Sequence, residues 1–239
     1  MQTGLYVSLS AQMALERRMT TLADNVANSG TAGFRAGGVT FDDVLTGLTN
    51  EAVSFVSTGE DSYDTAAGAL QETGNPFDFA VQGDAWFAIE TPAGPVVTRD
   101  GRFTLRDTGE LVTLEGHPVL DAGGAPLLLD PFAGPPEAGA DGTLRQNGQL
   151  AGAIGLFSFH PGPNSVRYGN SGFIPGNQPQ PVVDQPDVGI AQGFVEQSNV
   201  NPVHEMMRLI QVQRAFEQVT TLMRDSDTAL KDAIKTMGS

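Results

Sequence analysis

The segment 203–237 reads VHEMMRLIQVQRAFEQVTTLMRDSDTALKDAIKTM and contains neither proline nor glycine. Its apolar residues recur every seven positions, and Val212 and Val219 occupy the second heptad position. The first heptad position is held by Leu209, Phe216, Met223, Leu230 and Met237. Asn201-Pro202 precedes the segment and suits a helix N-cap followed by a first helical residue. The pattern predicts one coiled-coil helix of about 35 residues, roughly 50 Å long.

The other end of the chain shows a similar periodicity. Heptad-spaced and intervening positions before residue 30 are Leu5, Gln12, Leu15, Met19, Leu22 and Val26. One polar residue, Gln12, interrupts this stripe. Asn28-Ser29-Gly30 suits the C-cap of a helix. We therefore expect a second coiled-coil-type helix at the N-terminus, packed against the C-terminal helix.

Between the two ends the hydrophobic period changes from seven to two. Phe77, Phe79 and Val81 alternate with polar or small residues, and Gly-containing turn signals recur at short intervals after them. Asp100-Gly101 and Asn147-Gly148 fit two-residue hairpin turns. Short strands separated by such turns predict an antiparallel β domain.

These patterns predict an α+β fold in which a mainly antiparallel β domain is inserted between two long coiled-coil-type helices that pack together. The expected parts are an N-terminal helix of an inner domain, an extended connector, a β-rich outer domain, a Gly/Pro-rich return and a C-terminal helix of the inner domain. Their ranges are 1–35, 36–75, 76–160, 161–202 and 203–239.

Composition excludes several classes of protein. The 239 residues carry 13 Lys and Arg against 28 Asp and Glu, a formal net charge of -15, most of it in the middle of the chain. Coating nucleic acid or an anionic membrane requires basic patches, so neither is expected as a partner. The absence of cysteine excludes disulfides and thiolate chemistry. Residues 1–25 lack the basic start and apolar block of a secretory signal, which by itself would suggest a cytoplasmic protein.

The residues that could carry chemistry do not form a catalytic pattern. His204-Glu205 begins like the zinc motif H-E-x-x-H, but Arg208 occupies the place of the second histidine. His117 and His160 stand alone, and no phosphate-binding glycine loop is present. We expect no enzymatic activity, no small-molecule substrate, no metal and no cofactor.

Three blocks of sequence nevertheless resemble one family. The first is 22–35, which contains Asn25 and ends in Thr31-Ala32-Gly33-Phe34-Arg35. The second extends over 79–120 and includes Thr98-Arg99-Asp100-Gly101-Arg102-Phe103. The third is 193–202, followed by Gln213-Arg214-Ala215-Phe216-Glu217. Together they resemble the flagellar basal-body rod protein family. Within this family, the short length of the chain and its sequence around residue 201 are most similar to the proximal-rod members.

The resemblance implies a structural subunit of the bacterial flagellar basal body. Such a subunit would be exported by the flagellar type III apparatus without a cleavable signal, and would polymerise with copies of itself and neighbouring rod proteins into a hollow helical shaft that transmits torque across the periplasm. Asn25 and Asn28 would satisfy carbonyls at the helix end, and Gly33 would provide a tight turn into Phe34. The residues matching family motifs are Asn25, Asn28, Thr31, Gly33, Phe34, Gln213, Arg214 and Glu217.

The apolar heptad stripes are the predicted assembly interface, because one short helix cannot bury such a stripe alone. This interface comprises Leu5, Leu15, Met19, Leu22, Val26, Leu209, Val212, Phe216, Val219, Met223 and Leu230. Three alternatives remain open at this point: a distal-rod or hook-type paralogue, a secreted adhesin built on the β domain, and an enzyme that acts on the cell wall.

Overall fold

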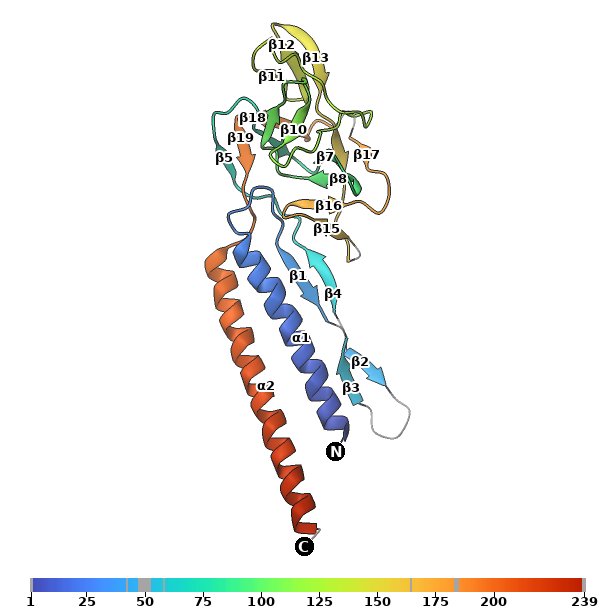
Figure 1. Cartoon of the computed structure of the whole chain (residues 1–239), viewed down its shortest axis with the longest axis vertical. Helices are drawn as coiled ribbons and strands as arrows, with labels where there is room; N and C mark the ends of the chain where they lie inside the picture. The colour runs from blue at the N-terminus through green and yellow to red at the C-terminus, as the bar shows by residue number, and fades with distance from the viewer. Residues whose placement is uncertain are drawn as a thin grey trace. The chain divides into compact units, whose positions relative to one another are not determined.

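A computed structural model describes residues 2–41, 43–46, 53–57, 59–163, 165–182 and 185–237. The chain forms two compact units. The first, here called the helical unit, comprises residues 1–27, 37–62 and 201–239. The second, here called the body, comprises residues 28–36 and 63–200. Figure 1 shows the elements along the chain.

The helical unit contains the two helices that the structure describes, α1 (Gln2–Ala27) and α2 (Pro202–Met237). The helices pack on each other, and α1 also contacts the strands β1 and β3. Strand β1 pairs with β4, and β2 pairs antiparallel with β3. The bounds are β1 Gly37–Thr40, β2 Asp43–Thr46, β3 Val53–Val56 and β4 Glu60–Tyr63. The stretch 36–75, expected to be an extended connector, therefore contains strands that cover part of α1.

The prediction of long coiled-coil helices is wrong. A coiled coil needs two continuous apolar seams that face each other while the other faces of both helices meet water. Here α1 has only 26 residues against the 36 of α2, so the longer helix cannot be paired along its whole length within the chain. Because strands occupy a second side of α1, this helix packs as part of a mixed α/β layer. The α+β class itself, with an antiparallel β-rich body, is confirmed.

The body is built around a six-stranded sheet of order β15-β16-β8-β7-β14-β17, in which every neighbouring pair is antiparallel. Strand β7 is buried almost throughout because it lies in the middle of the sheet. The bounds are β7 Trp86–Thr91, β8 Gly94–Thr98, β14 Leu156–Ser158, β15 Val166–Tyr168, β16 Gly172–Ile174 and β17 Gln180–Pro181.

Smaller antiparallel groups complete the body: β18 with β6, β19 with β5, β10 with β9, and the order β11-β12-β13. Their bounds are β5 Leu70–Glu72, β6 Phe79–Gln82, β9 Phe103–Leu105, β10 Leu111–Thr113, β11 Glu137–Ala138, β12 Thr143–Gln146, β13 Gln149–Ala153, β18 Gly189–Gln192 and β19 Phe194–Glu196. The last two strands come from the stretch expected to be a connector. They return the chain beside strands formed more than 100 residues earlier.

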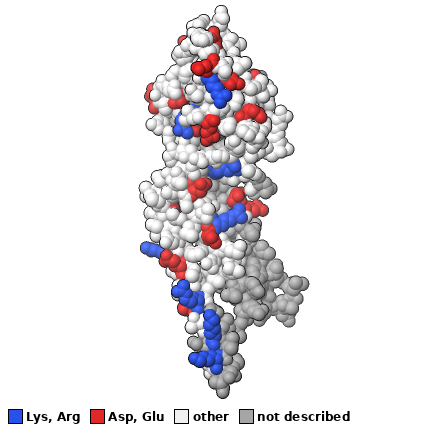
Figure 2. Space-filling model, in the orientation of Figure 1, with Lys and Arg blue, Asp and Glu red and all other residues white. Residues whose placement is uncertain are grey.

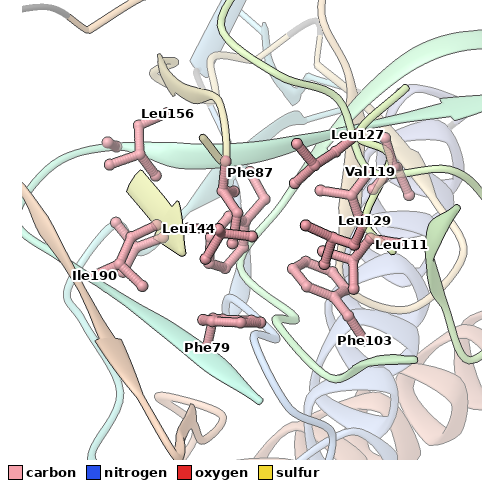
Figure 3. Close-up of a cluster of buried hydrophobic side chains, with 14 of the residues drawn as sticks. Phe79, Phe87, Phe103, Leu111, Val119, Leu127, Leu129, Leu144, Leu156 and Ile190 are labelled. Carbon is pink, nitrogen blue, oxygen red and sulfur yellow. The ribbon is translucent and has the colours of Figure 1, made fainter. Parts of the chain in front are cut away.

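One main apolar core joins most of these groups, although no residue of β5 or β19 belongs to it. Side chains from several strands converge in it, with Phe87 and Phe103 in edge-to-face contact at 5.2 Å between ring centroids. Figure 3 shows this cluster, in which Phe79 lies below Phe87 and Ile190 lies to one side. The predicted alternation in Phe79 and Val81 thus corresponds to a real inward face, although Ala80 between them, on the opposite face of β6, is also buried.

The two predicted hairpin turns have different outcomes. Asn147 and Gly148 join β12 to β13 with φ of 51° and 75°, as a type I′ turn requires, so this prediction is confirmed. Asp100 and Gly101 connect β8 to β9, which pair with different partners, so the hairpin prediction there is wrong. The backbone at Gly101 instead passes so close to Phe79 that an added Cβ would overlap the Phe79 carbonyl oxygen.

Neither described helix is long and apolar enough to cross a membrane.

Candidate functional site

The end of α1 is tied to the start of α2 by a buried amide–carboxylate contact. Asn25 is 2% exposed, and its Nδ2 donates to Glu205 Oε2 at 3.1 Å and to the carbonyl of Gly37 at 2.8 Å. Its Oδ1 accepts a hydrogen bond from the Gly37 amide at 2.8 Å. Asn25 therefore joins α1, α2 and the first residue of β1, rather than the helix-end carbonyls that the resemblance implied.

The first turn of α2 is capped as expected. Asn201 Oδ1 accepts the amide hydrogen of His204 at 3.1 Å, which satisfies a donor that lacks a helical partner. Pro202 is the first helical residue. Glu205 is 7% exposed and also accepts a charge-assisted hydrogen bond from Arg208 Nη1 at 2.9 Å. Glu205 lies in the first turn, where a negative charge is stabilised by the helix dipole.

The predicted assembly residues lie along the side of each helix that is least exposed. On α2 the less exposed positions recur three or four residues apart, the spacing of one helix face. Leu22 and Val212 are buried. The half-buried members are Leu15, Met19, Val26, Leu209, Phe216, Val219 and Met223. The side chains of Leu5 and Leu230 lie outside the described ones.

A second apolar group on α2 is exposed, and the sequence analysis did not single it out. Met207 is 53% exposed and Leu222 is 67% exposed. Val203, Met206 and Ile210 are 60%, 45% and 52% exposed and follow i, i+3, i+7 spacing, which places them on one face. The sequence shows that spacing, but the assembly interface was predicted from the stronger heptad stripe instead. Contiguous exposed apolar surface commonly marks an interaction site.

The motif residues that follow α1 belong to the body. Gly33 has a φ of +68°, and its amide donates to the carbonyl of Glu196 at 2.8 Å. Phe34 is fully buried beneath the guanidinium of Arg167, whose Cζ lies 4.4 Å from the ring centroid. Thr31 Oγ1 donates to Asn28 Oδ1 at 3.2 Å. On α2, by contrast, the motif residues Gln213, Arg214 and Glu217 are exposed.

A buried charge cluster lies where these motif blocks meet. Arg35 Nη1 is 2.6 Å from Glu196 Oε1, and Arg99 Nη1 is 3.2 Å from Glu196 Oε2. The three side chains are at most 3% exposed. Each comes from a different block: Arg35 from the segment after α1, Arg99 from the turn directly after β8 and Glu196 from the end of β19. The fold thus brings the three blocks of family-like sequence into one contact.

Trp86 is the aromatic partner of both cations in this cluster. The Cζ atoms of Arg35 and Arg99 lie 5.6 Å and 5.2 Å from the centre of its indole ring. Arg99 Nη2 also donates to the carbonyl of Gly83 at 2.8 Å. The pKa of the Arg99 guanidinium is lowered from its usual value, mainly because the group is buried and also because of the neighbouring charge of Arg35. The carboxylate of Glu196 offsets part of this shift. Cation–π attraction to a desolvated indole helps to hold two like charges in one interior.

Sequence reasoning did not select Arg35, Arg99 or Glu196 as site residues, although all three lay inside the motif blocks. The sequence held only a weak signal for their burial: in Phe34-Arg35 and Val195-Glu196 a charged residue directly follows an apolar one. A lone charge of this kind is ordinarily exposed. Only the pairing of segments 161 residues apart shows that these charges are buried together.

No metal-binding cluster occurs among the described residues. His204 is exposed on α2, and His160 pairs with Asp84 at 2.9 Å on the surface of the body. On the face drawn in Figure 2, acidic and basic side chains are interspersed over the described residues.

Comparisons with known proteins match this arrangement along the chain. Residues 5–35 match the family model "Flagella basal body rod protein", 80–151 match "Flagellar hook protein FlgE/F/G D1 domain", and 191–236 match "Flagellar basal body rod FlgEFG protein C-terminal". The matched ranges cover α1, much of the body, and α2 with the strands that lead into it. The three matches thus define a structural protein of the flagellar rod and hook class.

Whole-chain relatives narrow this class. A Mesorhizobium japonicum protein is 65% identical over 239 residues, and a Rhizobium meliloti protein is 56% identical over 238, with all of this chain and 99% of each relative covered. A Caulobacter vibrioides protein is 35% identical over 251 residues with the same coverage. All three are named "Flagellar basal-body rod protein FlgF". The chain belongs to the flagellar basal-body rod protein family. It is a structural subunit of the rod and not an enzyme.

Proposed function

We propose that the chain is a proximal-rod subunit that polymerises through its terminal helices into a hollow helical shaft and transmits motor torque across the periplasm. Its partners are other copies of itself and neighbouring rod proteins. The flagellar type III apparatus exports it. The FlgF name shared by the relatives above supports the proximal position over the distal-rod and hook-type alternatives.

The observation that carries this proposal is the apolar surface of α2. Val203, Met206 and Ile210 remain between 45% and 60% exposed although α2 already packs on α1. Fully burying such a side chain contributes about 1.5–3 kcal/mol, and because these three are about half exposed, a partner that covers them would contribute about half of that for each. The half-buried heptad residues Leu209, Phe216 and Met223 lie on the neighbouring face of α2 that packs toward α1, and a further helix can cover the part of them that α1 leaves exposed.

Heterologous contacts of this kind repeat without closing when the rotation between subunits does not close a ring. A tube then follows from the same contact used by every subunit. The motif residues Gln213, Arg214 and Glu217 are exposed on α2 and add polar contacts to the proposed interface.

The test compares two adjacent exposed positions that receive the same charge. Ile210→Asp places a carboxylate on the proposed interface, and Gln211→Asp places it one residue further along α2, at an exposed polar position. Ile210→Asp should abolish incorporation into purified basal bodies and motility, because the charge would be desolvated without a partner. Gln211→Asp should leave both at or near the wild-type level.

Two further measurements show whether a loss of motility comes from assembly rather than from lost stability or lost export. The melting of the purified monomer should be the same for both variants, because neither side chain is buried in the monomer. The amount of chain delivered outside the cytoplasm should also be equal. Normal motility with Ile210→Asp, in cells that contain only this variant, would refute assembly through this face of α2.

A further inference from the structure

Two segments far apart in the sequence run side by side within the body. Residues 28–36 directly follow α1, and residues 193–200 directly precede α2. The amide of Gly33 donates to the Glu196 carbonyl at 2.8 Å, and the amide of Asn199 donates to the Phe34 carbonyl at 3.3 Å. The amide of Ala36 donates to Asn199 Oδ1 at 2.7 Å. The segment that follows α1 therefore lies beside the segment that leads into α2.

Glu196 is central to this junction. Among the described residues it is the only carboxylate within ion-pair distance of Arg35 or Arg99, so two buried guanidinium groups share one negative charge. Its Oε1 also accepts the amide hydrogen of Gly68 at 2.8 Å. A buried ion pair that loses one partner leaves an uncompensated charge, which is strongly destabilising. Loss of the Glu196 charge would leave two such charges.

Further contacts bind the same two segments to the rest of the body. Arg167 Nη2 donates to the Arg35 carbonyl at 2.8 Å, and its guanidinium covers the ring of Phe34. Asn199 Nδ2 donates to the carbonyls of Asp64 and Ala66 at 3.0 and 2.9 Å. These contacts are polar or cation–π interactions. The main apolar cluster of the body contains none of Phe34, Arg35 or Glu196.

We propose that Arg35, Arg99 and Glu196, with Trp86, form a root clamp. The clamp is a local device that fastens the segments leading from α1 and into α2 to the body. Glu196 holds both segments, so loss of its charge frees them together while the apolar core stays folded. The clamp, rather than the core, then determines how firmly the segments 28–36 and 193–200 are held to the body. This role does not depend on the proposed assembly contact.

Hydrogen exchange measured by mass spectrometry on the full chain tests the clamp. In Glu196→Gln, peptides covering 28–36 and 193–200 should both exchange between about a hundred and a few thousand times faster than in the wild type, the range that corresponds to losing one partner of a buried pair. Peptides covering β10 and β12, whose residues Leu111 and Leu144 lie in the main apolar cluster, should keep their wild-type rates. The matched control is Glu72→Gln, which removes an exposed carboxylate from the strand that pairs with β19. It should change none of these rates.

The remaining outcomes all count against the clamp. Unchanged rates in both segments would show that Glu196 does not hold them. Faster exchange in one segment alone would show that they are not coupled, and faster exchange throughout the body would make the cluster part of global stability. If Glu196→Gln does not fold, Glu196→Asp keeps the charge but withdraws it by one methylene, and should show the same two-segment pattern at lower amplitude. A chain that also fails to fold with Glu196→Asp would overturn the proposal.

Discussion

At the scale of single residues, Gly33 shows why one position of a motif accepts only glycine. Its φ of +68° lies in the region that other residues rarely adopt, and an added Cβ would overlap the backbone of Arg99 and Asp100. We expect Gly33→Ala to lower the free energy of unfolding of the body by about 1–3 kcal/mol or more. Urea unfolding followed by the fluorescence of Trp86, the only tryptophan, measures this change.

Gly30→Ala is the control for this substitution. No atom lies within 4 Å of a Cβ built at Gly30, so the added methyl meets open space. Its midpoint of unfolding should stay within the error of the wild-type value. Equal effects of the two substitutions would mean that the steric conflict at Gly33 is relieved by a small backbone shift.

A second residue-scale prediction concerns Gln146, which is 6% exposed and fixes the loop that begins at Asp130. Its Oε1 accepts the Asp130 amide hydrogen at 3.0 Å, and its Nε2 donates to the carbonyls of Asp130 and Gly134 at 3.0 and 2.8 Å. Gln146→Leu leaves these backbone groups without partners and should lower stability by about 1–3 kcal/mol. Proteolysis should then cut near Phe132, which is 94% exposed, faster than in the wild type. Unchanged cleavage would show that the loop is held without this amide.

The sequence allowed some of these residues to be found and not others. Gly33 and Phe34 stood in a recognisable motif, and the capping residue Asn201 followed from local helix rules. The partners of Asn25 and the burial of Arg35 could not be found, because each depends on a segment that is distant in sequence. Local patterns report the preferences of the backbone, whereas burial of a charge is decided by tertiary pairing.

At the scale of elements, α2 has two apolar faces with different surroundings. Phe216 lies on the half-buried face that packs toward α1, whereas Leu222 is 67% exposed. We expect Phe216→Ala to destabilise the helical unit by about 1–3 kcal/mol, less than for a fully buried phenylalanine. Thermal unfolding followed by helical circular dichroism measures this loss.

Leu222→Ala provides the comparison on the same helix and should change the transition by less than about 0.5 kcal/mol. The unfolding of the body, followed by Trp86 fluorescence, should be the same in both variants, because neither residue belongs to it. A Phe216→Ala chain with wild-type helical stability would show that its ring contributes to assembly alone.

Elements with strong local signals were predicted better than elements that depend on context. The two helices and the Asn147-Gly148 hairpin follow from periodicity and turn chemistry. The coiled coil did not form because β1 and β3 occupy part of the surface of α1, and these strands have no strong pattern of their own. Strands β18 and β19 were missed for a related reason, since each is stabilised by pairing with a distant strand.

At the scale of the whole molecule, the net charge of -15 should oppose association. Chains that approach one another at low ionic strength repel over a Debye length of about 30 Å at 0.01 M, which falls to about 8 Å at 0.15 M. We therefore expect self-association of the purified protein to increase as salt rises across this range. Sedimentation velocity at equal protein concentration measures the shift.

A salt effect of the opposite sign would indicate that ion pairs between subunits dominate the contact. Repeating the measurement with Ile210→Asp separates the two contributions. Reduced repulsion should not rescue association once the apolar face of α2 carries a charge, because burying that charge still costs free energy in salt.

The overall class of the molecule could be predicted because its parts differ in hydrophobic period along the chain. The grouping of residues into two units could not, since residues 37–62 join the helices whereas residues 28–36 join the body. No composition boundary marks that exchange of short segments. The grouping into two units follows from the pairing of distant segments, which exists only in the folded chain.

The adjacency of residues 64 and 199 has a consequence for how such chains can diversify. Because the long segment of the body, residues 63–200, begins and ends at one place, where Asn199 Nδ2 donates to the Asp64 carbonyl at 3.0 Å, this segment behaves as a cassette. Its loops can lengthen, shorten or be replaced without changing the spacing of the two ends that connect it to the helical unit. Lineages could therefore remodel this cassette while inheriting the helical ends unchanged.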